Sequence, residues 1–213
     1  MVNGYDLAVF ADTSGQYTYV DLVLPDGARA RFARTSPGTG FPNSVFQNLS
    51  TPGPYYGSTI AQINATWTLS LKRGGKMIFG AGSMLSEIQD QNGNVLEIRR
   101  DASNNVNTIV SPNGRWLYFT YDSSHRVTSV QDEGGRTVQY SYNGAGSLAG
   151  VTNVAGGTTS YAYDSSGRLA TITTPDGNVH VSNQYDANGR VAQQTLVDGS
   201  TWQYAYATDK TTM

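Results

Sequence analysis

Apolar and polar residues alternate in short runs from about Trp67 to Tyr206, with glycine-containing turns between them. Alternation with period two places every second side chain on the same face of a strand. Asn-Gly or Asp-Gly between such runs is the strongest short-range signal for a β-hairpin. The pattern therefore predicts an all-β fold of antiparallel hairpins whose aromatic residues align across the sheet. The aligned sets are Leu117/Phe119/Tyr121, Val138/Tyr140/Tyr142, Thr159/Tyr161/Tyr163 and Trp202/Tyr204/Tyr206, and Asn183 interrupts the column in its own run.

An apolar pair spaced by three residues leads into every second turn. A helix would also suit this spacing, but roughly ten residues between turns leave little room for one. A β-bulge accommodates the spacing within a strand, and a neighbouring glycine allows it. The pairs are Leu85/Ile88, Val106/Ile109, Val127/Val130, Leu148/Val151 and Leu169/Ile172, whereas Val191 keeps the first position of the next pair and Gln194 breaks the second.

A tyrosine, mostly followed by Asp or Asn, returns at a nearly fixed interval. Tyr121, Tyr142, Tyr163, Tyr185 and Tyr206 are separated by 21, 21, 22 and 21 positions, and Asp122, Asn143, Asp164 and Asp186 follow the first four. Self-similarity at such a period indicates a repeat architecture in which each unit packs on its neighbours. Counting back in steps of 21 gives the degenerate copies Arg100-Asp101 and Phe79-Gly80, so we expect six units between Trp67 and Tyr206.

Each tyrosine leads into a turn whose residue types follow from its geometry. In the segment from Asp164 to Arg168, the Asp side chain can accept backbone hydrogen bonds and Gly167 can adopt a positive φ, as in a type I turn closed by a G1 bulge. Asp186 to Arg190, with Gly189, repeats this pattern. Where Gly is missing, Asn104 and His125 stand in its place, and both tolerate the left-handed region. A second set of turns contains Asn92-Gly93, Asn113-Gly114, Gly134-Gly135, Gly156-Gly157, Asp176-Gly177 and Asp198-Gly199.

The first 66 residues differ from the repeats, so we predict a cap segment over residues 1–66 and a repeat array over residues 67–213. Residues 17–24 and 28–34 flank Pro25-Asp26-Gly27 and predict one further hairpin. Residues 35–59 are rich in Pro, Gly and Ser and predict a long loop. We interpret this loop as a surface excursion, with a binding loop or plug as the alternative.

Composition excludes several classes of function. Charged residues make up 14% of the chain and the net charge is -2, so nothing indicates binding to nucleic acid or to an anionic membrane. The absence of cysteine excludes disulfides and thiolate chemistry. No apolar run is long enough for a membrane span, and Met1 to Phe10 lacks the pattern of a signal peptide. We predict no cofactor.

Candidate chemistry is sparse. Asp122, Asp164 and Asp186 form a row of equivalent turn residues, whereas acid–base catalysis needs two carboxylates in different environments. His125 and His180 show no metal-ligand spacing. We therefore expect no catalytic residue, no metal and no enzyme activity, and a hydrolase is the least favoured alternative. Trp116 and Trp202 are candidate ligand-stacking residues, although the same aromatic rows are what a sheet needs to pack repeat on repeat.

The segments Tyr163-Asp164-Ser165-Ser166-Gly167-Arg168-Leu169 and Tyr185-Asp186-Ala187-Asn188-Gly189-Arg190-Val191 closely resemble the YD repeat of the RHS-repeat family. Leu24-Pro25-Asp26-Gly27 and Trp67 to Phe79 also look like the stretch that leads into such arrays. Tyr121, Tyr142 with Asn143, and Tyr206 are further repeat-motif positions. The resemblance covers residues from about 67 to 206.

The resemblance implies that the chain is a segment of a large, curved and spiralling β-sheet shell. Similar shells occur in RHS proteins, in the B/C components of insecticidal toxin complexes and in teneurins. In bacterial polymorphic toxins, the shell encloses a toxin that is cut free inside it. The implied parent protein is secreted or displayed at the cell surface.

We expect a non-catalytic shell segment that encapsulates or displays a polypeptide such as a toxin. Its partners would be the rest of the shell, or further copies joined through open strand edges, because such edges pair with other chains unless they are covered. The alternative is a carbohydrate-binding or adhesive module that uses exposed Tyr and Trp rows.

Overall fold

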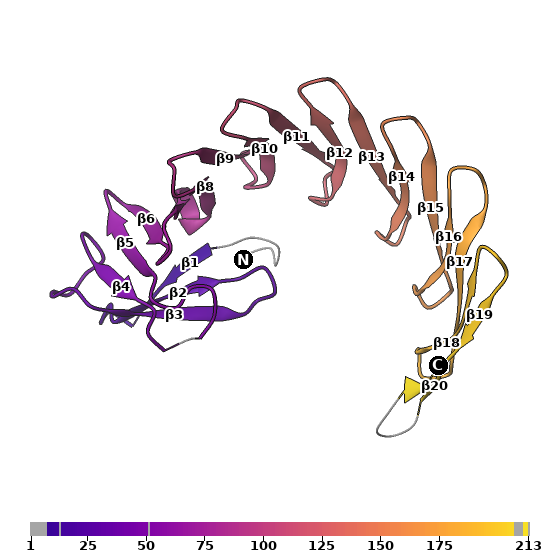
Figure 1. Ribbon diagram of the computed structural model, residues 1–213, viewed down its shortest axis with the longest axis horizontal. Helices are drawn as coiled ribbons and strands as arrows, with labels where there is room; N and C mark the ends of the chain where they lie inside the picture. The colour runs from indigo at the N-terminus through magenta and orange to yellow at the C-terminus, as the bar shows by residue number, and fades with distance from the viewer. Residues whose placement is uncertain (1–7, 13, 51, 207–210, 213) are drawn as a thin grey trace. The chain divides into compact units, whose positions relative to one another are not determined.

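The computed structural model describes residues 8–12, 14–50, 52–206 and 211–212, and nearly all of their regular structure is β-strand (Figure 1). One 3-10 turn, η1 (Ala81–Ser83), is the helical element of these residues. The strands are β1 (Ala8–Ala11), β2 (Tyr19–Val23), β3 (Arg29–Arg34), β4 (Val45–Gln47), β5 (Thr59–Ile63), β6 (Thr66–Ser70), β7 (Lys76–Phe79), β8 (Leu85–Gln89), β9 (Val95–Arg100), β10 (Val106–Val110), β11 (Trp116–Tyr121), β12 (Val127–Asp132), β13 (Thr137–Tyr142), β14 (Leu148–Thr152), β15 (Thr158–Tyr163), β16 (Leu169–Thr173), β17 (Val179–Tyr185), β18 (Val191–Leu196), β19 (Thr201–Gln203), β20 (Ala205–Tyr206) and β21 (Thr211–Thr212).

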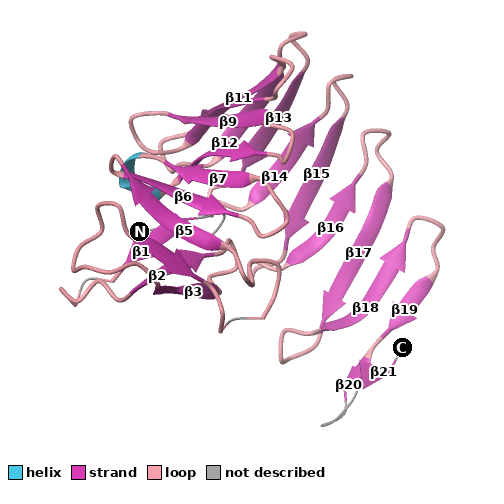
Figure 2. Ribbon diagram, turned by 60° about the vertical axis from the view of Figure 1, so that its left-hand side comes forward, coloured by secondary structure: helices cyan, strands magenta, loops and turns pink. Residues whose placement is uncertain are grey.

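The strands form two series of antiparallel neighbours, one in each of two compact units, Met1–Trp116 and Leu117–Met213. In the first unit, each strand from β1 to β10 pairs with the next one along the chain. In the second unit, the same holds from β11 to β19 (Figure 2). The predicted all-β fold of antiparallel hairpins is confirmed.

The first unit contains a hydrophobic core. Its strands alternate between buried and exposed positions, as β3 shows with buried Ala30 and Phe32 between exposed Arg29, Arg31 and Ala33. Large apolar side chains from several strands are fully buried in this core, and they are Val20, Leu22, Phe32, Phe46, Ile60, Leu69 and Phe79. Removing this apolar surface from water is the main stabilising term for the unit.

The first unit also brings distant strands together. An antiparallel bridge joins Ala8 on β1 to Met84, which directly precedes β8. Trp67, Phe79 and Leu85 belong to the same core cluster as Val20. The core of the described residues therefore extends across the border at residues 66 and 67 that composition suggests, and the division into cap and array stays a prediction.

Segment 17–34 forms the hairpin that its sequence predicts, as strands β2 and β3. Within residues 35–59, for which composition predicts a loop, Val45–Gln47 forms the short strand β4 between β3 and β5. Phe46 at its centre is fully buried. Burial of the Phe46 side chain offsets the entropy cost of ordering this strand. The Pro-, Gly- and Ser-rich residues on both sides are typical of a loop, so the sequence pattern does not predict the strand.

The second unit is built differently, because its large apolar side chains are half-buried or exposed among the described residues. The tyrosine face of β13 and β15 is partly covered, and the positions between the tyrosines are exposed. Those alternate positions carry short, uncharged side chains such as Gln139, Ser141 and Ser160. One face of this unit is thus aromatic and aliphatic, and the other is rich in hydroxyl and amide groups.

The bulges predicted from the spacing of three are confirmed. In the pairing of β15 with β16, Tyr163 lies opposite Leu169 and Tyr161 lies opposite Ile172, with a register shift between them. The shift leaves one extra residue on β16, so both apolar residues point to the tyrosine face. Equivalent shifts occur at Phe79, Tyr121, Tyr142 and Tyr185.

Candidate functional site

The turns at both ends of the strands share one geometry. In the turn from Asp164 to Arg168, the Asp164 N–H donates to the Arg168 carbonyl and the Gly167 N–H donates to the Asp164 carbonyl, at 2.9 and 3.0 Å. Gly167 has a φ of 75°, and the predicted left-handed conformations of Asn104 and His125 are confirmed at 65° and 60°. The second set of turns repeats these bonds, for example from Thr174 to Asn178. The repeats thus use one five-residue turn twice.

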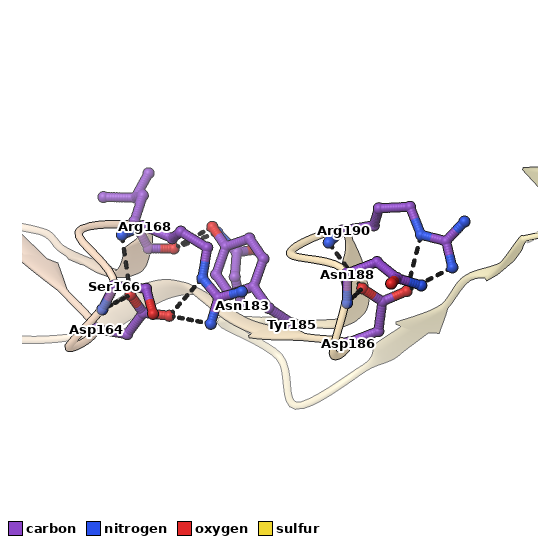
Figure 3. Close-up of polar contacts among 9 residues, drawn as sticks. Asp164, Ser166, Arg168, Asn183, Tyr185, Asp186, Asn188 and Arg190 are labelled. Atoms are coloured by element: carbon purple, nitrogen blue, oxygen red, sulfur yellow. Dashed lines mark hydrogen bonds and ion pairs between the residues drawn. The ribbon is translucent and has the colours of Figure 1, made fainter.

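The aspartate that opens the turn is saturated by local contacts. Asp164 Oδ1 accepts the backbone N–H groups of Ser166 and Arg168, both at 2.9 Å. Its Oδ2 accepts the Nε and a terminal N–H of the Arg168 guanidinium, both at 2.7 Å. Asp186 with Arg190 forms the same pair, in which planar guanidinium and carboxylate meet side by side (Figure 3). Asp122 with Arg126 forms it as well.

The arginine of each pair also contacts the tyrosine of the following repeat. Arg168 lies over the ring of Tyr185, with its guanidinium carbon 4.4 Å from the ring centroid. Arg126 over Tyr142 and Arg190 over Tyr206 repeat the contact at 4.4 and 4.3 Å. Such cation–π contacts contribute about 0.5–1 kcal/mol at exposed sites. The arginine therefore joins the turn of one repeat to the strand of the next.

The tyrosine hydroxyl completes the connection. Tyr185 Oη donates to the backbone carbonyl of Leu169, at 2.7 Å, at the bulge that follows Arg168 (Figure 3). A bulge removes a residue from the ladder, so its backbone groups need another partner. Tyr142, Tyr163 and Tyr206 donate in the same way to the carbonyls of Val127, Leu148 and Val191. We use the name Asp–Arg–Tyr contact for a turn aspartate, the arginine paired with it and the tyrosine of the next repeat, as in Asp164, Arg168 and Tyr185.

Two irregularities of the repeat find a structural reason. Arg100 stands where a tyrosine is expected, and its guanidinium donates to the carbonyl of Leu85, 15 residues back, at 3.1 Å. Tyr142, Tyr163 and Tyr206 also reach back 15 residues. The single interval of 22 residues is absorbed in β17, where the register shifts between Val181 and Val179 and His180 is the extra residue.

The two positions that break the apolar pattern meet each other. Asn183 on β17 lies directly opposite Gln194 on β18. Gln194 Nε2 donates to Asn183 Oδ1 at 2.9 Å, and Asn183 Nδ2 donates to the Leu169 carbonyl at 3.1 Å. A polar group on an apolar face is costly when it is unpaired, and here each amide has a partner.

Electrostatics supports a stabilising role for the turn aspartates. The hydrogen bond from the Arg126 side chain, followed by that from its backbone N–H, lowers the pKa of Asp122. For Asp164 and Asp186, the backbone N–H of the paired arginine is the leading cause of a lowered pKa. A general acid needs a raised pKa, so these carboxylates are poor proton donors at neutral pH.

Other chemistry-bearing groups stay apart. Among the described residues, no three His, Cys, Asp or Glu side chains cluster as metal ligands would. His125 occupies a turn and His180 a strand, as the sequence predicts. A shallow depression of about 410 Å³ on the polar face is lined by hydroxyl and amide groups, including Thr120, Ser129 and Gln139, and offers no carboxylate pair. No helix in the described part of the chain has the length and apolar character of a membrane span.

The structure places the candidate residues in two kinds of position. The repeat-motif residues of the second unit surround the turns, and three sets of them form the Asp–Arg–Tyr contact, namely Asp122–Arg126–Tyr142, Asp164–Arg168–Tyr185 and Asp186–Arg190–Tyr206. Of the candidate stacking residues, Trp116 is half-buried at the start of β11, and Trp202 on β19 is 46% exposed. Sequence reasoning missed the hydroxyl bond, for which the preference for Tyr over Phe is the signal, and it missed Arg126 and Arg136 as partners of Asp122 and Asp132.

The geometry defines a class of protein, namely a β-sheet wall made of repeats that are joined by tyrosine and by turn ion pairs. Comparison with known families agrees, because the model of the teneurin YD-shell matches residues 77–183, about half of the chain. The chain belongs to the teneurin YD-shell family.

Solved structures with the same fold include TcdB2-TccC3-TEV, with 13% identity and a TM-score of 0.53 over 96% of this chain and 12% of that one. TcdB2-TccC3-Cdc42 matches with 14% identity and a TM-score of 0.50 over 94% of this chain and 11% of that one. This chain therefore spans about an eighth or less of their length, and at such identity the likeness concerns the fold alone. No curated protein matches the sequence.

Proposed function

We propose that this chain is a non-catalytic wall segment of a YD-repeat β-shell that encloses or displays a polypeptide. The observation that carries the proposal is the Asp–Arg–Tyr contact. In the repeats that contain it, the carboxylate, the guanidinium and the tyrosine hydroxyl are all engaged in joining one repeat to the next. A carboxylate, guanidinium or hydroxyl that already has such a partner stabilises the wall and is not free to take part in a reaction.

The mechanism we propose is sequestration. A sheet of paired strands has its backbone groups satisfied by neighbouring strands, so it separates a cargo from solvent without binding it through the backbone. In the second unit, one face carries uncharged groups such as Thr120, Ser129 and Gln139. The parent protein would act outside the cell, in keeping with the toxin-complex and teneurin relatives of the repeat.

A wall grows through its strand edges, and β19 offers one. Within the described residues, β19 pairs with β18 on one side, in the register Gln193 with Gln203 and Gln194 with Trp202. The Leu196 N–H donates to the Ser200 carbonyl, so these two residues form a hydrogen-bonded pair of the ladder. Two positions further along, Gln194 and Trp202 form the next hydrogen-bonded pair, and Gln193 and Gln203 form a non-hydrogen-bonded pair. Since these pairs alternate, the Gln203 N–H points away from β18, toward the position of a further strand. We propose that the rest of the shell, or a second copy, pairs there.

The absolute mass of the chain in solution tests this proposal. Light scattering after gel filtration, across a hundredfold range of concentration, should show reversible association. Gln203→Pro removes the outward N–H without touching the ladder to β18, and Pro is tolerated at a strand edge, so association should be lost. Gln203→Ala is the matched control and should associate normally.

Two results would overturn the proposal. A monomer at every concentration would show that the edge is not a docking surface. Association that persists in Gln203→Pro, with an unchanged thermal midpoint, would place the contact elsewhere.

The second candidate function, binding of carbohydrate, is favoured by one observation, the exposed Trp202 beside an amide pair.

A further inference from the structure

One cross-strand row of the second unit differs in chemistry from the others. On the tyrosine face, the rows combine an aromatic residue, an aliphatic residue and a β-branched residue on three neighbouring strands. In the last row, two amides and an indole replace all three. The rows are Phe119–Val130–Val138, Tyr140–Val151–Thr159, Tyr161–Ile172–Val181 and Asn183–Gln194–Trp202.

The amide pair retains hydrogen-bonding capacity. A side-chain amide has two N–H donors and a carbonyl with two lone pairs. Gln194 uses one donor toward Asn183 Oδ1. Its second N–H and its Oε1 make no other hydrogen bond within the described residues, and the side chain is half-buried, so solvent reaches it. Asn183 is held in place by its bond to the Leu169 carbonyl, which fixes the orientation of the pair.

The indole lies directly beside these amides. Trp202 is paired with Gln194 across β18 and β19, so the two side chains point to the same face. Its side chain is 46% exposed, whereas Trp67 in the first unit is 4% exposed. Indole is a flat apolar surface with one N–H donor, and such a surface next to free amide groups can hold a ligand that is apolar on one side and hydroxylated at its rim.

We propose that the row Asn183–Gln194–Trp202 is a binding site for a neutral pyranose sugar. The C–H face of the ring stacks on the Trp202 indole, and two adjacent hydroxyls exchange hydrogen bonds with the Gln194 amide. The ligand is neutral because the row contains no ionisable side chain, and nearby Asp186 and Arg190 are paired with each other. This inference rests on the second candidate function and deepens it, because it names the site and the class of sugar that would attach the wall to a glycan.

The site is open and flat, so binding should be weak, with a Kd on the order of 1 mM. The test is an NMR titration of the ¹⁵N-labelled chain with cellohexaose and, separately, with mannohexaose. The indole N–H signal of Trp202, assigned from Trp202→Phe, should shift while those of Trp67 and Trp116 stay unchanged. Raising the salt from about 0.05 to about 0.5 M should leave the affinity unchanged, because no charge takes part.

Two variants separate the site from the fold. Trp202→Ala should weaken binding about tenfold or more through loss of the stacking surface. The double variant Asn183→Tyr/Gln194→Ile restores the residue types of the preceding row, so it should fold at least as stably as the parent and lose binding. Gln193→Ala is the matched control, because Gln193 is the neighbouring amide on the other face of β18 and pairs with Gln203, so this variant should bind normally.

Several outcomes would overturn the proposal. The first is the absence of any shift with both oligosaccharides at about 20 mM, a concentration well above the expected Kd. The second is binding that survives in the double variant, which would place the site elsewhere. A shift produced by a neutral peptide but by neither sugar would assign the row to a protein partner. Each of these readouts is independent of the mass measurement at the β19 edge.

Discussion

At the scale of the residue, the tyrosine hydroxyl explains why the repeat uses Tyr where Phe would fill the same space. Tyr163 Oη donates to the Leu148 carbonyl at 2.8 Å, at the bulge of the preceding strand. The bulge lets two apolar residues share a face, but it also leaves a carbonyl outside the ladder. The tyrosine hydroxyl thus provides a hydrogen-bond donor for the bulge carbonyl 15 residues earlier in the chain.

Tyr163→Phe should destabilise the chain by about 1 kcal/mol, because the Leu148 carbonyl loses its partner while the ring contacts remain. Urea unfolding followed by circular dichroism measures the change. Tyr161→Phe is the control, since Tyr161 lies on the same face of the same strand and its hydroxyl makes no hydrogen bond to another described residue. Equal effects of the two substitutions would argue against the role of the bulge carbonyl.

At the scale of the element, the five-residue turn determines the composition of the repeat. A left-handed fourth residue favours Gly and accepts Asn104 or His125, and an Asx side chain caps the turn from its first position. Asn143 caps its turn through two backbone N–H groups without an arginine partner. The charge of Asp is therefore needed for the ion pair and for the contact with the next tyrosine, and not for the turn itself.

Stability should fall as the pH is lowered from about 5 to about 2, since the folded pKa values of Asp122, Asp164 and Asp186 lie below the unfolded value of about 3.9. The native state binds protons less readily than the unfolded chain, so the stabilisation is present above the unfolded pKa. It is lost as the pH falls through the folded pKa. Urea midpoints measured across this range should trace the loss.

The triple variant Asp122→Asn/Asp164→Asn/Asp186→Asn should show a shallower dependence on pH, because Asn keeps the backbone acceptor and cannot titrate. Other turn aspartates, such as Asp132, also have lowered pKa values, so part of the slope should remain. An unchanged slope in the triple variant would show that the acid sensitivity arises elsewhere in the chain.

At the scale of the whole molecule, the two units depend on different interactions. The first unit buries Phe32, Phe46 and Phe79 completely in one apolar core. The second unit leaves its large apolar residues half-buried or exposed and relies on contacts between successive repeats. In a repeat array, each unit is stabilised mainly by its nearest neighbours, so local opening at an edge costs little.

Native-state hydrogen exchange should therefore be slowest in β2, β3, β6 and β7, and fastest among the strands in β19. The first group surrounds fully buried side chains, whereas all three residues of β19 are exposed. Exchange measured by mass spectrometry on peptides from each unit checks this. Uniform protection along the chain would indicate that the two units open as one.

Much of the repeat could be predicted from the sequence because its determinants are local. A turn is specified by four or five adjacent residues, and alternation along a strand assigns each side chain to a face. The spacing of Leu169 and Ile172 even locates the bulge, which the register of β15 with β16 confirms. Family membership followed from the same local features.

Only the tertiary structure decided which residues meet across strands. Tyr185 reaches the carbonyl of Leu169, and Asn183 meets Gln194, because pairing brings together residues that lie 11 to 16 positions apart. In the first unit, the bridge between Ala8 and Met84 likewise joins distant segments. Local residue types fix the turn and the face of a side chain, whereas pairing partners follow from the free energy of the assembled sheet and its core.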